Sequence, residues 1–226
     1  MKRLIKTSLL FFAYFFILAC SAEERELPGR QLFEEHFLKG LHLGSSESLF
    51  KETFESAICR QSPPVNSPYS HWSHSKCMLD PMKRDTISIS IPGSGPVTVV
   101  QYEAEFFYER LESTVFQFLK KDFSRVYQDF KTVLGKPTRE SSKRIAGQLG
   151  PTLFRNKITI WKQPDYSIKL QSRPGGGSIS LLQFYTSTYP LRLKEPFEKQ
   201  LKESSDVSTY NLQHYEDIIK KIDSNY

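Results

Sequence analysis

The amino-acid sequence predicts an α+β fold with two tandem units, each a helix packed on an antiparallel β-sheet, followed by a C-terminal helix. Apolar residues recur at helical spacing ahead of two groups of strand-like segments. Inside those segments apolar and polar residues alternate, and short turns rich in glycine and proline separate them, which favours hairpins. The repeat lies in the order of elements, not in matched residues. It gives residues 37–121 and 122–190 as the two units and residues 191–226 as a helical segment.

The first 19 residues have the composition of a secretory signal peptide. A basic start precedes an apolar run over residues 9–19, which is too short for a membrane-spanning helix. Residues 20–36 contain a Pro-Gly pair and are predicted to be a tether. Residues 1–19 carry three cations and no anions, so the formal net charge of +6 falls to +3 without them. No basic run interleaved with aromatic residues follows, so nucleic acid is not an expected partner.

Two processing sites are open. The run Ile17-Leu18-Ala19-Cys20 resembles a lipobox, in which Cys20 would be acylated and become the first residue of the mature chain. Ser21 would then favour the outer membrane. The alternative is ordinary cleavage after Ala22. Both alternatives predict export to the periplasm, and the first predicts a lipid anchor in the membrane.

The remaining cysteines, Cys59 and Cys77, are predicted to form a disulfide, because an even pair in an oxidising compartment is usually oxidised. The bond would be worth about 3 kcal/mol in the loop-entropy description. His71 and His74 lie between the two cysteines, so a four-ligand zinc site is the alternative. The spacing is not that of a standard zinc finger. We therefore expect no metal and no cofactor.

The first unit is predicted to contain one helix and three strands, the last of them at residues 111–119. Residues 31–43 fit either a helix or a short strand, and Gly44-Ser45-Ser46 provides a turn and an N-cap. A helix is expected from Leu49 to Ile58, followed by a loop rich in proline and serine. Alternation then predicts strands over residues 86–91 and 97–108.

The clearest segment runs from a strand at residues 111–119 into a helix. Six apolar residues share one face of that helix: Phe123, Val126, Tyr127, Phe130, Val133 and Leu134. Asp122 is the expected N-cap, and Gly135 can adopt the left-handed conformation that ends helices. Pro137 prevents the helix from continuing. The aromatic positions on this face indicate a buried core.

The second unit is predicted to contain three strands after a polar loop at residues 139–156. The strands are expected at residues 157–162, 166–171 and 178–187, separated by turns. A helix is expected near the C-terminus, because five apolar residues recur there at helical spacing: Leu212, Tyr215, Ile218, Ile219 and Ile222.

Short motifs carry a family resemblance. The run Gly40 to Gly44 followed by a Ser-capped helix resembles the opening of BamE-type envelope lipoproteins. A strand from Leu111 to Phe118 leads into a helix that ends Leu134-Gly135-Lys136-Pro137. Strands with Trp161 and with Ile168-Lys169-Leu170 follow, an order that resembles small exported bacterial proteins of unassigned role. Those proteins usually have tyrosine where this chain has leucine before the glycine.

The tandem arrangement is also similar in architecture to beta-lactamase inhibitory protein. These resemblances cover roughly residues 37–187. They imply a fold and a compartment, and no binding or catalytic residue carries over, since a fold does not specify a function.

No enzyme motif is complete. Gly93-Ser94-Gly95 lacks the frame of a nucleophile elbow, and the glycine run at residues 175–177 lacks the lysine and hydroxyl residue of a P-loop. Glu103 and Glu105 could form an acid and base pair, but the solvated face of an antiparallel sheet explains them better.

The sequence therefore predicts a non-enzymatic envelope protein that binds another envelope protein through a sheet face or the disulfide loop. Tyr69, Trp72 and Tyr102 are the candidate aromatic anchors. One alternative is a metal-dependent enzyme that uses His71 and His74. Another is a module that binds a cell-wall or lipid ligand between helix and sheet.

Overall fold

The computed structural model is an α+β structure built on one antiparallel sheet. It describes residues 41–61, 73–79, 88–89, 96–147, 150–173, 177–203 and 209–226. The strands in these ranges are β1 Ala57–Gln61, β2 His74–Leu79, β3 Ser88–Ile89, β4 Val97–Phe107, β5 Arg110–Leu119, β6 Arg139–Gly147, β7 Gly150–Lys162, β8 Tyr166–Gln171 and β9 Ile179–Thr186. The helices are α3 Glu47–Thr53, the 3₁₀ turn η1 Lys120–Asp122, α4 Phe123–Leu134, α5 Tyr189–Glu203 and α6 Thr209–Asn225. None of the described helices is long and apolar enough to cross a membrane.

The described strands follow the order β1-β2-β4-β5-β9-β8-β7-β6 across the sheet, and β3 pairs with β4 beside this path. In sequence order, one set of path strands, β1, β2, β4 and β5, follows α3, and another set, β6 to β9, follows α4. The last strands of the two sets pair with each other, from Ser113 opposite Tyr185 to Leu119 opposite Ile179. The two sets therefore share one continuous sheet.

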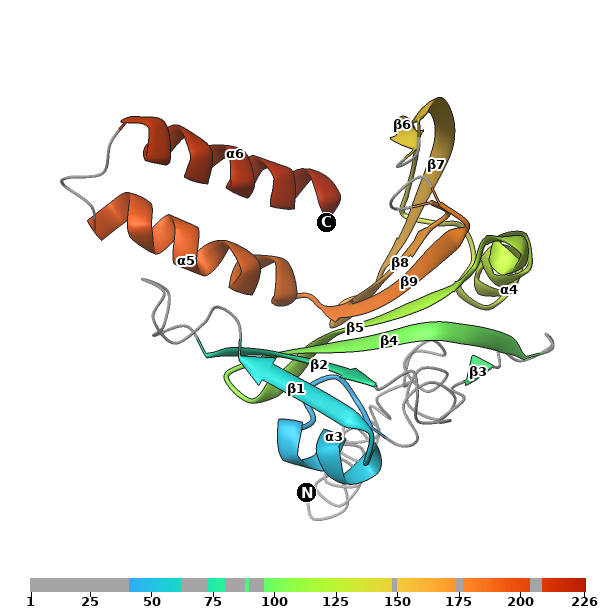
Figure 1. Cartoon of the computed structure of the whole chain (residues 1–226), viewed down its shortest axis with the longest axis horizontal. Helices are drawn as coiled ribbons and strands as arrows, with labels where there is room; N and C mark the ends of the chain where they lie inside the picture. Colours follow the sequence, from blue (N-terminus) through green and yellow to red (C-terminus); the bar gives the residue numbers. More distant parts are fainter. Residues whose placement is uncertain are drawn as a thin grey trace, which may run out of the picture.

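The sheet has two differently covered faces. Figure 1 shows it curving so that β6 and β7 rise on the side where α5 and α6 lie. The face toward α5 and α6 is called the inner face here, and the opposite one the outer face. Helices α3 and α4 pack on the outer face (Figure 1).

The main hydrophobic core lies between the outer face and these two helices. Phe50 of α3 is fully buried, and its ring lies 5.4 Å from that of Phe106 on β4. Phe130 of α4 lies 5.9 Å from Trp161 on β7 and 6.0 Å from Phe184 on β9. Burial of each such ring contributes roughly 1.5–3 kcal/mol. One core thus spans both halves of the sheet.

A smaller aromatic cluster attaches α5 and α6 to the inner face. Phe107, Tyr185 and Tyr189 are buried together, and Tyr226 packs against them. Tyr189 is the first residue of α5, and Tyr226 follows α6 directly. Lys194 of α5 forms an ion pair of 2.9 Å with Asp223 of α6, which joins the two helices.

Several sequence predictions are confirmed. Strand β8 has the predicted bounds, and β4, β5 and β9 each lie within a residue or two of theirs. Helix α4 ends at Leu134, and Gly135 has a positive φ of 76°. The Gly135 carbonyl then accepts a 3.0 Å hydrogen bond from the Trp161 indole, which locks the end of α4 to β7.

Other predictions need correction. The helix predicted from Leu49 to Ile58 is shorter than expected, since α3 ends at Thr53 and Ala57 to Gln61 form β1. The prediction was wrong because Ala57 and Ile58 fit both helical and strand periodicity. The Ser46 hydroxyl does cap α3, accepting a hydrogen bond from Leu49 N at 3.2 Å. Of the strand expected at residues 86–91, only Ser88 and Ile89 lie in the described residues, as β3.

The polar segment at residues 139–156 is not a loop. It forms β6 and the first half of β7, and its apolar content is low because β6 is an edge strand. Asp122 does not cap α4 with its side chain. It belongs to η1 and instead accepts a 3.1 Å hydrogen bond from Arg125.

Candidate functional site

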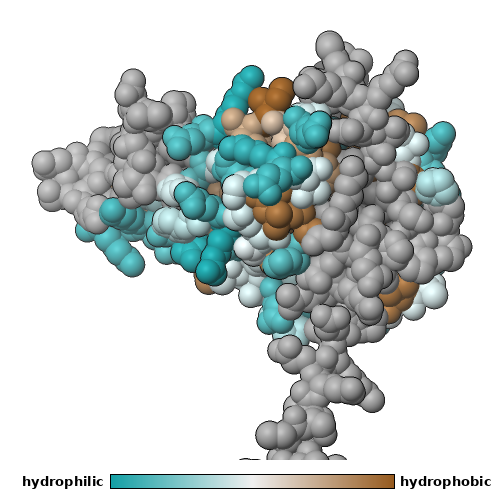
Figure 2. All heavy atoms as spheres, turned by 90° about the horizontal axis from the view of Figure 1, so that it is seen from below, coloured by the Kyte–Doolittle hydropathy of each residue, from teal (hydrophilic) through white to brown (hydrophobic). Residues whose placement is uncertain are grey.

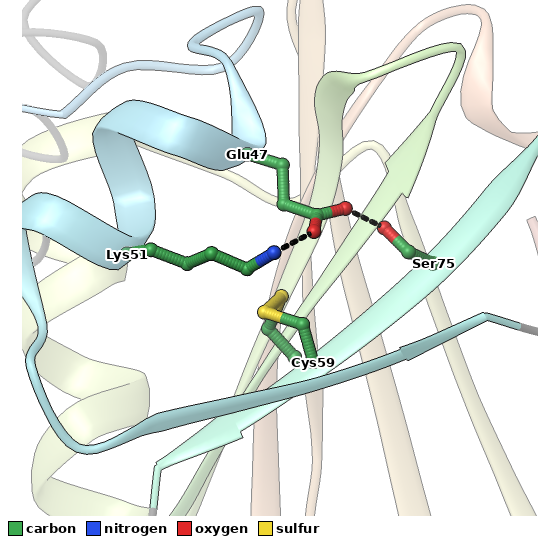
Figure 3. The surroundings of a disulfide bond; sticks show 5 residues. Glu47, Lys51, Cys59 and Ser75 are labelled. Carbon is green, nitrogen blue, oxygen red and sulfur yellow. Dashed lines mark hydrogen bonds and ion pairs between the residues drawn. A yellow bond between two sulfur atoms is a disulfide. The ribbon is translucent and has the colours of Figure 1, made fainter.

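The predicted disulfide is present. Cys59 of β1 and Cys77 of β2 are bonded and stand directly opposite each other in the strand register, with their Cα atoms 4.0 Å apart. Cys77 is fully buried beneath α3. The bond therefore fixes the edge strand β1 to the body of the sheet (Figure 3).

The disulfide excludes the zinc site suggested by the spacing of cysteines and histidines, because both sulfurs are bonded to each other and no thiolate is left. Glu47 also lies beside the two sulfurs, with all three potential ligand atoms within 4.8 Å. Its carboxylate accepts hydrogen bonds from Ser75 and from Lys51, the latter at 2.5 Å (Figure 3). Burial would raise the pKa of Glu47, but these two partners outweigh burial and lower it.

The other predicted site residues divide into those outside and those inside the described part of the chain. Cys20, Tyr69, His71 and Trp72 lie outside the described residues. Tyr102 is described and is buried in the outer core, 4.7 Å from Phe116, so it is not the surface anchor that the sequence suggested. The alternation in β4 identified its face correctly, but that face is the one covered by α3.

His74 is part of a contact cluster on the inner face. Its ring stacks on Phe107 with centroids 4.3 Å apart, and its Nε2 lies 4.0 Å from the Glu105 carboxylate. The side chain is only 10% exposed. This packing accounts for His74 without a metal.

A row of partly exposed residues crosses the inner face over six neighbouring strands. In register order from β4 to β6, the residues are Gln101, Gln117, Leu181, Gln171, Ile158 and Ser141. We refer to these six residues as the central row. Three of them are glutamines, whose amides can both donate and accept hydrogen bonds. Because the sheet beneath is held by the outer core, the row is a rigid surface.

One end of the inner face carries charges that are paired within the protein. Lys76 of β2 lies 2.5 Å from Glu103 and 3.6 Å from Glu105 on β4. Glu105 also accepts a 2.5 Å hydrogen bond from the Tyr189 hydroxyl of α5. We call Lys76, Glu103, Glu105, His74 and Tyr189 the paired cluster.

The pKa values in the paired cluster reflect this pairing. Burial would lower the pKa of Lys76, but the two glutamates outweigh it and raise the pKa. Burial raises the pKa of Tyr189 far above its usual value, and the nearby Glu105 adds to the increase. The cluster therefore holds α5 against the sheet with a proton fixed on the Tyr189 hydroxyl and another on the Lys76 amine.

The other end of the inner face is basic. Lys169 of β8 lies opposite Ile160 of β7, which lies opposite Arg139 of β6, so the two cations are two strands apart on the same face. Lys143 lies on that face of β6 too, beyond Ser141 of the central row. Lys169 is 7% exposed, and its amine lies 4.6 Å from the centre of the Tyr226 ring. We call Lys169, Arg139 and Lys143 the basic end.

The hairpin of β6 and β7 carries further cations, mainly on the outer face, where Glu140 accepts a hydrogen bond from Tyr127 of α4. A surface hollow of about 620 Å³ is lined by Ser142, Lys143, Arg144, Leu153 and Arg155. Leu153 is 60% exposed. The hollow thus combines cations with an apolar contact point, and Lys143 is its one lining residue that belongs to the basic end.

The outer surface gives a contrasting picture. Figure 2, seen from the side of α3, shows the described residues as mainly hydrophilic with small separate hydrophobic patches. Leu49 of α3 is one exposed apolar residue, at 42%. Scattered apolar residues of this kind are normal on protein surfaces and need no ligand.

No family model, curated protein or solved structure matches this chain. The inner face itself therefore supplies the functional inference. It presents amides, hydroxyls and charges on a rigid curved sheet, an arrangement suited to recognition through hydrogen bonds and ion pairs.

Sequence reasoning singled out Glu103, Glu105 and His74 but missed the other members of the two ends of the inner face. One signal was available, because Ser167, Lys169 and Gln171 alternate with apolar residues in β8 and must share a face. Glu103 and Glu105 were recognised as sharing a face but not as partners of Lys76 or Tyr189. Those contacts depend on which strands and helices become neighbours.

Proposed function

We propose that this chain is a non-enzymatic binding module that engages a protein partner with the inner face of its sheet. The observation that supports the proposal is the central row, a partly exposed line of amide, hydroxyl and apolar side chains across six strands. Interfaces between proteins commonly combine such hydrogen-bonding groups with apolar contacts.

The proposal includes the arrangement of the chain and its compartment. Two tandem helix-plus-sheet units, joined through β5 and β9, form a scaffold whose inner face is free of the two outer helices. A signal peptide and a lipid on Cys20 attach the scaffold to the outer membrane from the periplasmic side. The partner is then another protein of the envelope. The Cys59–Cys77 disulfide supports this compartment, because such bonds persist under oxidising conditions.

Site-specific photo-crosslinking tests the binding face. A photoreactive amino acid replaces Gln117 or Gln171 of the central row in the full chain, produced in its own cells. The matched control carries the same residue at Glu52 on α3, which is exposed. We expect discrete adducts of one partner from the central row only. Equal adducts from the control position, or none from the central row, would contradict the proposal.

The anchoring part of the proposal has its own test. Intact mass of the mature protein from isolated membranes distinguishes an acylated chain that begins at Cys20 from an unmodified chain that begins at Glu23. We expect the acylated mass. The unmodified mass would disprove the lipid anchor and leave the binding face unaffected.

A further inference from the structure

Lys169 is a buried cation without an anionic partner among the described residues. Its side chain is 7% exposed, and it makes no hydrogen bond or ion pair to any residue in the described ranges. Its amine instead lies over the face of the Tyr226 ring, 4.6 Å from the ring centre. A lysine that is almost fully buried is normally paired, since taking a charge out of water is costly.

The charges nearest to Lys169 increase that cost. Burial, together with repulsion from Arg139 and Lys143, lowers the pKa of Lys169 to about 8. Most of the amines are still protonated at neutral pH. The folded protein therefore keeps three cations on one face, with Ser141 between Arg139 and Lys143, and an anion between them would be stabilised by all three.

Groups around Lys169 are fixed in position. Arg139 donates a 3.0 Å hydrogen bond to the Ser224 carbonyl at the end of α6, which holds its guanidinium beside the inner face. Gln183 lies opposite Lys169 on β9, and its amide donates to Ser113 at 2.9 Å. Gln171 of the central row follows Lys169 on the same face of β8. The basic end is thus continuous with the central row.

We infer that the basic end is a binding site for a carboxylate of the protein partner, an aspartate or glutamate side chain that reaches Lys169, Arg139 and Lys143 from the central row. This inference rests on the proposed function. A carboxylate fits better than a phosphate, because Lys169 lies beside the Tyr226 ring and Ile160, and a singly charged group loses less hydration on entering such a site.

The first test uses peptide probes on the full-length protein with lysine labelled with ¹³C at Cε. The probe is acetyl-Glu-Glu-Glu-amide, and the matched neutral probe is acetyl-Gln-Gln-Gln-amide. The Glu probe should move the Lys169 signal and raise the Lys169 pKa by about one pH unit or more, as a nearby opposite charge does. No change with the Glu probe, or an equal change with the Gln probe, would overturn the inference. Saturation by inorganic phosphate without any response to the Glu probe would overturn the choice of carboxylate.

Two variants locate the site. Lys169→Met should reduce binding of the Glu probe at least tenfold, whereas Lys162→Met, an exposed lysine on the neighbouring strand β7, should leave it unchanged. Circular dichroism confirms that both variants are folded. Equal binding by Lys169→Met and the wild type would place the probe elsewhere and overturn the inference.

Crosslinking separates this inference from the proposed function. If Lys169→Met gives the central-row adduct as strongly as the wild type, the carboxylate site is wrong and the binding face stands. If the wild type gives no adduct while the Glu probe binds at Lys169, the proposed function fails, and with it the assignment of the carboxylate to a protein partner. Loss of the adduct in Lys169→Met alone supports both.

Discussion

The two ends of the inner face treat charge in opposite ways. In the paired cluster, Lys76 has two carboxylates within 3.6 Å, although its side chain is 38% exposed. At the basic end, Lys169 is far more buried and has two cations as its charged neighbours. If both ends served only stability, the more buried lysine would be the one with partners. The comparison indicates that the paired cluster holds the fold together, and it supports our proposal that the basic end binds a partner.

Position in the fold agrees with this division. The paired cluster joins strands β2 and β4 to the first turn of α5 through the bond between Glu105 and Tyr189. Glu112 reinforces the same junction by accepting hydrogen bonds from Thr186 and Thr188, the latter at 2.8 Å. The basic end instead borders the partly exposed central row. One end therefore fixes α5, and the other faces an accessible surface.

The largest effect on stability is expected from the disulfide, which joins β1 covalently to β2, the strand that carries Lys76 of the paired cluster. Cys59→Ala/Cys77→Ala should lower the free energy of unfolding by about 3 kcal/mol, because the unfolded chain regains the entropy of an open loop. Urea unfolding measures this value, and reduction of the wild type is the control. Binding of the Glu probe at Lys169 should not change. A loss of stability below about 1 kcal/mol would contradict the expected contribution of the disulfide. A loss of probe binding would contradict the proposed separation of the two ends.

The next largest effect is expected from Glu105→Ala. It removes the acceptor of the buried Tyr189 hydroxyl and one partner of Lys76, and should cost about 2 kcal/mol. The same urea assay measures it, with Glu55→Ala at an exposed position as the control. A cost equal to that of the control would show that the paired cluster does not stabilise the junction with α5.

Unlike the two preceding changes, Lys169→Met should stabilise the protein. It should raise the free energy of unfolding at pH 7 by on the order of 1–3 kcal/mol. The wild-type lysine has a pKa of about 8 when folded and 10.5 ordinarily, so the unfolded state binds more protons between these values. Wild-type stability should therefore rise relative to Lys169→Met as the pH increases from about 8 toward 10. Unfolding at pH 7 and pH 9.5 measures both effects. Parallel behaviour of Lys169→Met and the wild type would mean that the amine is not destabilising.

The smallest effect is expected on the outer face, where an ion pair is exposed. Glu140 forms a 3.0 Å ion pair with Lys157 and accepts a 2.9 Å hydrogen bond from Tyr127, but its side chain is 43% exposed. Glu140→Gln should change the free energy of unfolding by about 0.5 kcal/mol or less. A change as large as that of Glu105→Ala would show that pairing alone, without burial, determines the contribution of the paired cluster.

Much of the fold follows from local patterns in the sequence. The apolar face of α4, the alternation in β4 and β8, and the two lone cysteines predicted their elements or bond correctly. The prediction was wrong where local patterns are ambiguous. Ala57 and Ile58 fit a helix and a strand equally, and the polar residues 139–144 lie in an edge strand and are mostly exposed. Neither ambiguity can be resolved without the neighbouring strands.

The candidate site was less predictable, for a physical reason. The alternation in the sequence predicted that Lys169 and Glu103 lie on the polar faces of their strands. Whether each charge finds a partner depends on pairings between distant strands and on helices α5 and α6 lying over one face. Tyr102 shows the same limitation, because alternation alone does not say which face of a strand a helix will cover.

The pairing of β5 with β9 also has a consequence for how the chain reaches its native state. Gln183 and Ser113, which are hydrogen-bonded across this pair, are 70 residues apart in the sequence. Until β9 has formed, β5 is an open edge with unpaired amides and carbonyls, available to any other strand. Such distant pairing raises the contact order and slows folding. The middle of the sheet is thus completed late. Until then, the open edge of β5 can pair with a strand of a second copy of the chain, which would lead to aggregation.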